Sequence, residues 1–374
     1  MNVERDIAGF ALPFTAGVFV TAYAAGEFGI DKSPISSIAL AVILVATAVL
    51  LAQNRQMAKP LNSHAITWTL IISAAAACGA LAVSTGLNLN IDMPASQLKS
   101  LATEAGLRMQ SATDSIPFKS PQTGALIKAL LTGDRSSLPP EVTKAFRASG
   151  ASHILALSGL HLGIIYMLVS KTLSLIGNSI QAKRIRSVLV ISFCGIYTLA
   201  TGAGASIVRA FLFILLGETA KLCGRHQSLK QILFASLIIH LTIFPLSAKS
   251  VGFQLSYAAI AGIAFIFPWL EGLWPKSGNS VMRWIWKSVA LSISCQMTTG
   301  PLAYLYFGTF PQYFLLTNLI ALPLTGLLIP SALLTQILNS LDLNVLQSCT
   351  EWMAYITEAQ ADLLTWALGI IASM

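Results

Sequence analysis

The chain has 374 residues, of which 55 % are hydrophobic and only 10 % are charged, and its formal net charge is +8. A soluble domain usually carries about 25 % charged residues, so this composition excludes an ordinary soluble protein. Its apolar runs are continuous and often about 17–25 residues long, enough for a helix to cross a membrane. A membrane β-barrel would instead alternate apolar and polar residues. The sequence therefore predicts an all-α integral membrane protein, a polytopic helical bundle of about 10–11 transmembrane helices.

The first part of the chain, residues 1–87, contains three apolar runs that we predict to be N-terminal transmembrane helices, at 7–25, 36–52 and 65–87. The first run could be mistaken for a signal peptide, because Tyr23 stands between two alanines as in many cleavage sites. However, Glu4 and Asp6 dilute the positive charge that normally precedes the apolar core of a signal peptide. We therefore expect an uncleaved first helix.

The next part, residues 88–152, does not read as a membrane span but has helical periodicity. Apolar residues recur at spacings of three and four over 98–112. A second helix is expected between Ser120, a suitable N-cap that a proline follows, and Gly133, a suitable C-cap. A third is expected over 140–149. Short amphipathic helices beside spans usually lie on the membrane surface, so we predict an extracytoplasmic amphipathic helical segment.

The remaining residues, 153–374, are predicted to form one transmembrane domain. Its expected spans are 153–176, 187–202, 206–222, 230–247, 252–270, 284–307, 313–338 and 353–373.

Basic residues gather in the short loops on one side of this arrangement. Placing the N-terminus in the cytoplasm assigns these basic residues to the cytoplasmic side: Arg5, Arg55, Lys59, Lys171, Lys183, Arg184, Arg186, Lys221, Arg225, Lys230, Lys276, Arg283 and Lys287. Cytoplasmic loops of membrane proteins carry such an excess. We therefore predict a multi-pass protein with a cytoplasmic N-terminus, in which most of the positive charge reflects topology and not a nucleic-acid-binding face.

Four segments occur in the order found in one known family. They are LLTGDRSSLPPEVTKAFRASGASHILALSGLHLGI (130–164), TGAGASIVRA (201–210), GFQLSYAAIAGI (252–263) and QMTTGPLAYLYFGTFPQYFLLTNLIALPL (296–324). Together they resemble the ComEC competence family, whose members are thought to pass single-stranded DNA through the cytoplasmic (inner) membrane. The resemblance implies that 153–374 is a competence-type channel domain, with single-stranded DNA and membrane lipids as partners. The channel could be formed by a homodimer or enclosed by a single chain, and the sequence does not decide between these arrangements.

The sequence also departs from larger family members. The stretch between Leu87 and Gln122 is too short for their outer OB-fold domain, and no metallo-β-lactamase-like domain follows the last span. The five histidines form no HxH metal motif, and no GxxxxGK[ST] phosphate loop is present. We therefore expect a channel-only member that is not an enzyme and has no cofactor or metal. An outer DNA receptor and a cytoplasmic helicase or translocase would then be separate proteins.

The glycine-rich segment before the span at 206–222 is a candidate part of the DNA path. Gly202 and Gly204 precede a helix N-terminus, where exposed N–H groups and the helix dipole attract anions. Arg209 follows inside an apolar segment, and an intramembrane arginine is by default a functional candidate. Its alternatives are snorkelling to the outer surface and pairing with Glu218.

Ser158, Gly159 and His161 of the SGLHL segment form a second candidate group. The serine and the histidine are spaced i, i+3 and are expected on one face of a helix. We consider three roles for them: lining a pore, forming hydrogen bonds at a helix interface, or acting as the nucleophile and base of an intramembrane serine hydrolase.

Polar residues inside three later spans complete the candidate path. They are Gln254 and Ser256, Gln296 and Thr299, and Asn318. Pro301 is expected to kink one span, and Pro323 and Pro330 are expected to interrupt the next, as in broken helices that line cavities. The alternative is that these polar groups join helices to one another. A small-solute or lipid transporter on the same scaffold is a further possible function.

Overall fold

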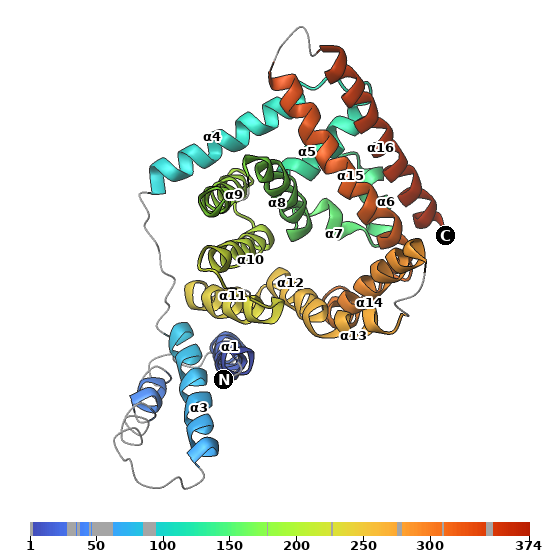
Figure 1. Cartoon of the computed structure of the whole chain (residues 1–374). Helices are drawn as coiled ribbons and strands as arrows, with labels where there is room; N and C mark the ends of the chain where they lie inside the picture. Colours follow the sequence, from blue (N-terminus) through green and yellow to red (C-terminus); the bar gives the residue numbers. More distant parts are fainter. Residues whose placement is uncertain are drawn as a thin grey trace. The chain divides into compact units, whose positions relative to one another are not determined.

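The computed structural model consists of helices, with no strand among the residues that it describes (Figure 1). The described residues are 3–27, 35, 38–44, 46, 63–84, 95–177, 179–225, 227–274, 279–308, 310–341 and 347–374. The predicted span at 36–52 lies largely outside these residues. The chain divides into two compact units, one made of Met1–Met93 and His226–Ala264, the other of Pro94–Arg225 and Phe265–Met374.

The first unit is built on two helices that pack through small residues. Its elements are α1 (Val3–Glu27), α3 (Ser63–Ser84), α11 (Leu229–Ile243), the 3-10 turn η2 (Pro245–Lys249) and α12 (Val251–Ala261). Gly17 of α1 packs against the backbone of Ala76, and Gly79 of α3 packs against the backbone of Phe14. A side chain at either glycine would collide with the facing helix, so these glycines permit the close approach that holds membrane helices together.

The second unit contains the remaining helices. They are α4 (Ala95–Asp114), α5 (Pro121–Thr132), α6 (Pro140–Ala148), α7 (Ser152–Leu155), α8 (Gly159–Leu173), η1 (Ser174–Ile176), α9 (Ile180–Ala200), α10 (Ala205–Leu222), α13 (Phe267–Gly272), α14 (Ser280–Phe307), α15 (Phe314–Ser340) and α16 (Gln347–Ser373). A π-helical turn, η3 (Gly262–Ile266), connects α12 to α13.

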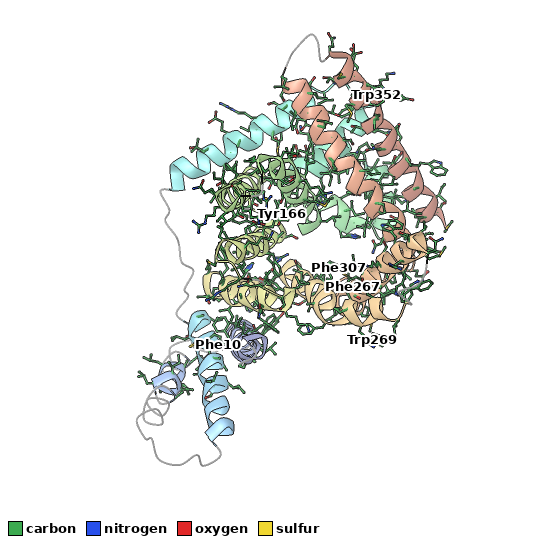
Figure 2. The ribbon with its side chains drawn as sticks, in the orientation of Figure 1. Phe10, Tyr166, Phe267, Trp269, Phe307 and Trp352 are labelled. Atoms are coloured by element: carbon green, nitrogen blue, oxygen red, sulfur yellow. The ribbon has the colours of Figure 1, made fainter. Side chains whose placement is uncertain are left out.

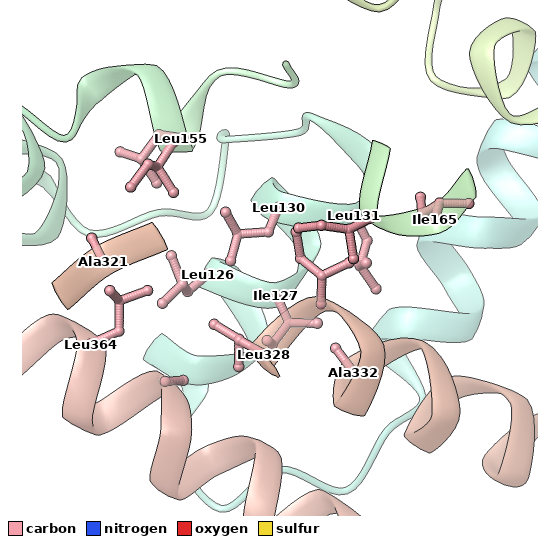
Figure 3. Packing of buried hydrophobic residues seen from close by; sticks show 14 of the residues in the cluster. Leu126, Ile127, Leu130, Leu131, Leu155, Ile165, Ala321, Leu328, Ala332 and Leu364 are labelled. Carbon is pink, nitrogen blue, oxygen red and sulfur yellow. The ribbon is translucent and has the colours of Figure 1, made fainter. Parts of the chain in front are cut away.

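Helix α5 lies at the centre of the apolar core of the second unit. Leu126, Ile127 and Leu130 are at most 1 % exposed and pack with residues of α8, α15 and α16, including Leu328 and Leu364 (Figure 3). Burying apolar side chains of this size stabilises a fold by roughly 1.5–3 kcal/mol each. The predicted ends of α5 are confirmed, because Ser120 is its N-cap and Gly133 is its C-cap in the left-handed conformation.

Both ends of α5 are held by side chains from distant helices. The backbone N–H of Ser120 donates to Oε1 of Glu358 on α16 at 2.6 Å. The hydroxyl of Tyr197 on α9 donates to the carbonyl of Leu131 at 2.6 Å. A buried helix end needs such partners. Residues 95–152 therefore pack in the same unit as 153–225, and the boundary at 152 stays a prediction.

Among the residues that the structure describes, three helices are long and apolar enough to cross a membrane, at Gly159–Ile176, Val251–Gly272 and Phe314–Ser340. Shorter apolar helices occur at Ile7–Tyr23, Ile71–Ser84 and Leu229–Ile243. The protein is thus an all-α membrane protein, and the count of about eleven spans stays a prediction. The expectation that Pro323 and Pro330 break the helix is wrong, because both lie inside the continuous helix α15. A proline removes one backbone donor, and packed membrane helices tolerate that loss.

Large aromatic side chains lie exposed on the surfaces of the long helices. Trp269, Phe307 and Trp352 are all more than half exposed, and Figure 2 shows them on α13, α14 and α16. Exposed apolar surface of this extent marks contact with lipid or with another molecule. In a chain of this composition, lipid is the natural partner.

Candidate functional site

Two of the four sequence segments singled out above, 130–164 and 201–210, meet in the second unit at the start of α8. The turn Gly133–Arg135, which we call the GDR turn, follows α5. A Cβ atom placed on Gly133 would lie 3.1 Å from Cδ1 of Leu157. A Cβ atom placed on Gly159, at the start of α8, would lie 3.3 Å from Cβ of Ala210 on α10. The GDR turn, the start of α8 and the first turns of α10 are therefore neighbours.

Ser158 precedes helix α8 and does not lie within it. Its backbone is extended, with φ −121° and ψ 170°, and it is the N-cap of the helix. The imidazole of His161 folds back in a capping box, so that Nδ1 accepts from the backbone N–H of Ser158 at 3.3 Å and lies 3.0 Å from its hydroxyl oxygen. The prediction that both residues share a helix face is thus corrected, because the extended conformation of Ser158 starts the helix one residue later.

Helices α8 and α10 run parallel. Gly159 lies beside Ala210, and seven residues further along α8 the hydroxyl of Tyr166 donates to Oε1 of Glu218 at 2.7 Å. The N-termini of α8 and α10 therefore point the same way. An α-helix N-terminus carries about half a positive charge, so two such ends side by side attract anions.

The other end of this pair is tied together by Glu218. Glu218 is 4 % exposed, and its carboxylate accepts from Tyr166 on α8, from Ser187 on α9 at 2.6 Å and from Lys221 at 2.6 Å. Figure 2 labels Tyr166 within this group of helices. Because Ser187 is near the start of α9, that helix runs antiparallel to α8 and α10. A buried carboxylate with three donors is a satisfied structural contact.

The predicted glycines and arginine lie at the start of α10. Gly202 has φ +82°, which favours glycine, and Gly204 is the N-cap of the helix. Arg209 is 1 % exposed. The alternative that it snorkels to a surface is therefore not supported in the structure, and Glu218 is held by the partners named above.

The remaining candidates are divided between the two units. Gln254 and Ser256 belong to the first unit, where the side-chain amide of Gln254 donates to the hydroxyl of Tyr23 at 3.1 Å and to the carbonyl of Ala248 at 2.9 Å. Gln254 therefore joins elements within that unit. Gln296 and Thr299 on α14 and Asn318 on α15 belong to the second unit.

Polar groups on α14 and α15 are of two kinds, paired and unpaired. Towards α16 they are paired, with Ser331 donating to Gln360 at 2.7 Å and Thr335 lying 3.1 Å from the hydroxyl of Thr357. In contrast, Nε2 of Gln296 and Oδ1 of Asn318 are buried and have no hydrogen-bond partner among the described residues. The α15–α16 contacts join helices, whereas the unpaired groups of α14 and α15 are suited to contact water or a ligand.

Two features of the site were not selected from the sequence. The first is Arg135, which is exposed in the GDR turn. Only the GDR motif could have pointed to this residue in the sequence. The cluster of Tyr166, Ser187 and Lys221 around Glu218 joins residues 52, 31 and 3 positions from it, which no local pattern reveals.

These observations define an all-α membrane protein with a cluster of sequence motifs at two parallel helix N-termini. A family model described as "Competence protein" matches residues 130–374. The chain belongs to this competence protein family. No solved structure matches it.

Three curated proteins illustrate the relationship. The chain is 27 % identical over 213 residues to ComE operon protein 3 of Bacillus subtilis, covering 56 % of this chain and 25 % of that protein. It is 28 % identical over 215 residues to competence protein ComA of Neisseria gonorrhoeae, covering 56 % and 30 %. It is 25 % identical over 255 residues to the uncharacterized protein YcaI of Escherichia coli, covering 65 % and 32 %. The matches thus span only a quarter to a third of these relatives.

Proposed function

We propose that this protein passes single-stranded DNA through the cytoplasmic membrane during natural transformation. The observation that carries the proposal is the contact between the family segments 130–164 and 201–210 where the parallel helices α8 and α10 begin. Helix N-termini attract phosphate through backbone N–H groups without placing full charges in the path. Passage of a polyanion requires weak attraction at several sites, because strong binding would hold the polymer in place.

Polar groups that could line the DNA path beyond the start of α8 are also present. A path lined by polar but uncharged groups suits a moving DNA strand. Gln296 and Asn318 have buried polar atoms without a hydrogen-bond partner among the described residues. In this proposal the N-terminus is cytoplasmic, DNA arrives from an outer receptor, and a cytoplasmic helicase or translocase supplies the energy. The protein itself would conduct DNA and not cleave it.

The test of this function separates two stages of DNA uptake. A deletion strain should take labelled DNA into the periplasm normally but should deliver none to the cytoplasm. Normal delivery in that strain would contradict the proposal.

A point variant tests the observation itself. Gly159→Leu should block delivery at near-normal protein abundance, because any side chain there presses on Ala210. Gly163→Leu on the same helix is the matched control, since a Cβ atom at Gly163 has no neighbour within 4 Å. Equal delivery by the two variants would show that the α8–α10 contact is not part of the path.

The 3.0 Å distance between the hydroxyl of Ser158 and Nδ1 of His161 favours a second candidate, an intramembrane serine hydrolase. A serine nucleophile needs a base within this reach. However, the same nitrogen also accepts from the backbone N–H of Ser158, as a helix cap requires. Labelling of purified protein by a fluorophosphonate, lost in Ser158→Ala, would establish the hydrolase. We expect no labelling.

A further inference from the structure

Arg135 is an exposed cation in the turn that packs against Leu157, just before the N-terminus of α8. It follows Gly133 by two residues, and Gly133 contacts Leu157, which immediately precedes the N-cap Ser158. The neighbouring carboxylate of Asp134 is already engaged, because it accepts from the backbone N–H of Ser136 at 2.9 Å and lies 3.7 Å from Nζ of Lys128. These contacts lower the pKa of Asp134, with the hydrogen bond from Ser136 as the main favourable cause. Arg135 has no ion-pair partner among the described residues.

His161 supplies a second and independent observation at the same helix end. Its side chain is folded over the N-terminus of α8, and the residue is only 1 % exposed. Since Nδ1 accepts from the backbone N–H of Ser158, the proton of the neutral ring is on Nε2. This Nε2–H group is buried and has no acceptor among the described residues. A buried donor without a partner costs about 1–3 kcal/mol, which indicates that an acceptor is missing from the site.

We propose that Arg135, the N-terminus of α8 and the Nε2–H group of His161 form a binding site for a phosphodiester group. A phosphodiester has one negative charge and two free oxygen atoms, which match the paired donors of a guanidinium. The helix N-terminus adds backbone N–H groups, and an oxygen of the ligand, or a water that enters with it, accepts from His161. The ionised Asp134 beside Arg135 keeps the attraction weak.

The source of the phosphodiester is a DNA strand if the proposed function holds, and a lipid headgroup has the same chemistry. The proposal rests on the proposed function for the first source only. Phosphodiester binding can be measured on purified protein without transformation, so the two ideas can fail separately.

The experiment uses the full-length protein in nanodiscs of zwitterionic lipid, with binding of fluorescent oligodeoxythymidylate followed by anisotropy over a range of salt concentrations. Arg135→Gln should weaken binding roughly two- to fivefold. It should also reduce the slope of log affinity against log salt by about 0.7, the value for one phosphate contact on a single strand. Arg184→Gln is the matched control, because it removes an exposed arginine near the start of α9, at the Glu218 end of these helices.

His161→Asn separates the two roles of the imidazole. The shorter amide can replace Nδ1 as the acceptor for the cap but cannot reach the position of Nε2. This variant should therefore keep the thermal unfolding midpoint and lose affinity for the oligonucleotide. A second series measures binding of short-chain phosphatidylglycerol to the same variants.

Weaker oligonucleotide binding by both variants, with normal binding by the Arg184 control, supports a DNA phosphate site. Loss confined to phosphatidylglycerol supports a phosphodiester site but assigns it to lipid. If wild-type protein binds oligonucleotide and both variants match it in both series, the site is wrong and the proposed channel stands. If the wild-type protein binds neither the oligonucleotide nor phosphatidylglycerol, the proposed site is wrong as well.

Discussion

Ser158 shows how one residue can separate the candidate functions. In Ser158→Ala the backbone N–H that donates to His161 remains, so only the hydroxyl contribution to the cap is lost, about 1 kcal/mol. We expect near-normal transformation and near-normal abundance in membranes. Transformation frequency and immunoblotting of the membrane fraction measure these together. Loss of transformation at normal abundance would instead show that the hydroxyl itself reacts.

Single residues also show what the sequence alone could predict. The unusual position of Arg209 in an apolar segment was visible, and so was the glycine-rich N-terminus of α10. The pairing of Glu218 with Tyr166 and Ser187 was not, because each partner lies on a different helix. Periodicity reports which face of a helix is apolar, but it carries no information about which helix that face meets.

Helix α5 gives the same lesson at the scale of an element. Its limits followed from local signals, the Ser120–Pro121 start and the Gly133 stop, and these limits are confirmed. Its burial against other helices was not predicted from the sequence. The contacts that bury it come from Glu358, 238 residues from Ser120, and from α15. Such contacts depend on the packing of the whole unit.

Helix α15 places a constraint on membrane topology. Near its C-terminal end, Asn339 donates to the hydroxyl of Ser115 at 2.9 Å, and near its start Thr317 donates to the carbonyl of Ser149 at 2.7 Å. The intervening helix is about 33 Å long, close to the thickness of a hydrocarbon core. If α15 crosses the membrane, Ser115 and Ser149 lie near opposite surfaces, so 88–152 cannot lie wholly outside.

We expect that cysteines placed at the exposed positions Ser115 and Arg147 react with an impermeant maleimide from opposite sides. The reason is that α15 is apolar enough to span and these positions lie near its two ends. Labelling in intact and lysed protoplasts distinguishes the two sides. Reaction of both cysteines from outside would mean that α15 lies along the membrane and that the segment is extracytoplasmic, as the sequence suggested.

At the scale of the whole molecule, orientation can be argued from charge and packing together. Ser187 of α9 bonds to Glu218 of α10, so the basic residues in the first turns of α9 and at the end of α10 lie at one end of these helices. They are Lys183, Arg184, Arg186, Lys221 and Arg225. Cytoplasmic loops carry such charge, which supports the predicted orientation of this end.

We therefore expect Arg184→Cys to react with the impermeant maleimide only after lysis, whereas Ala205→Cys should react in intact protoplasts. Both positions are exposed, so accessibility through the protein does not limit either reaction. The reverse pattern would place the starts of α8 and α10 in the cytoplasm. They could then not be the first part of the path that an incoming strand meets.

The unequal ends of the α8–α9–α10 group have a mechanical consequence. At Glu218 the three helices are fastened by short hydrogen bonds, whereas Gly159 and Ala210 meet only through apolar contact. The contacts of Glu218 would therefore act as a pivot if α10 moves relative to α8. The start of α10 at Ala205 lies about 20 Å from Glu218, so a tilt of the helix by about 10° moves its start by about 3 Å. Such a movement is comparable to the diameter of a water molecule. Rocking about Glu218 would therefore change the distance between the starts of α8 and α10 without breaking the hydrogen bonds of Glu218.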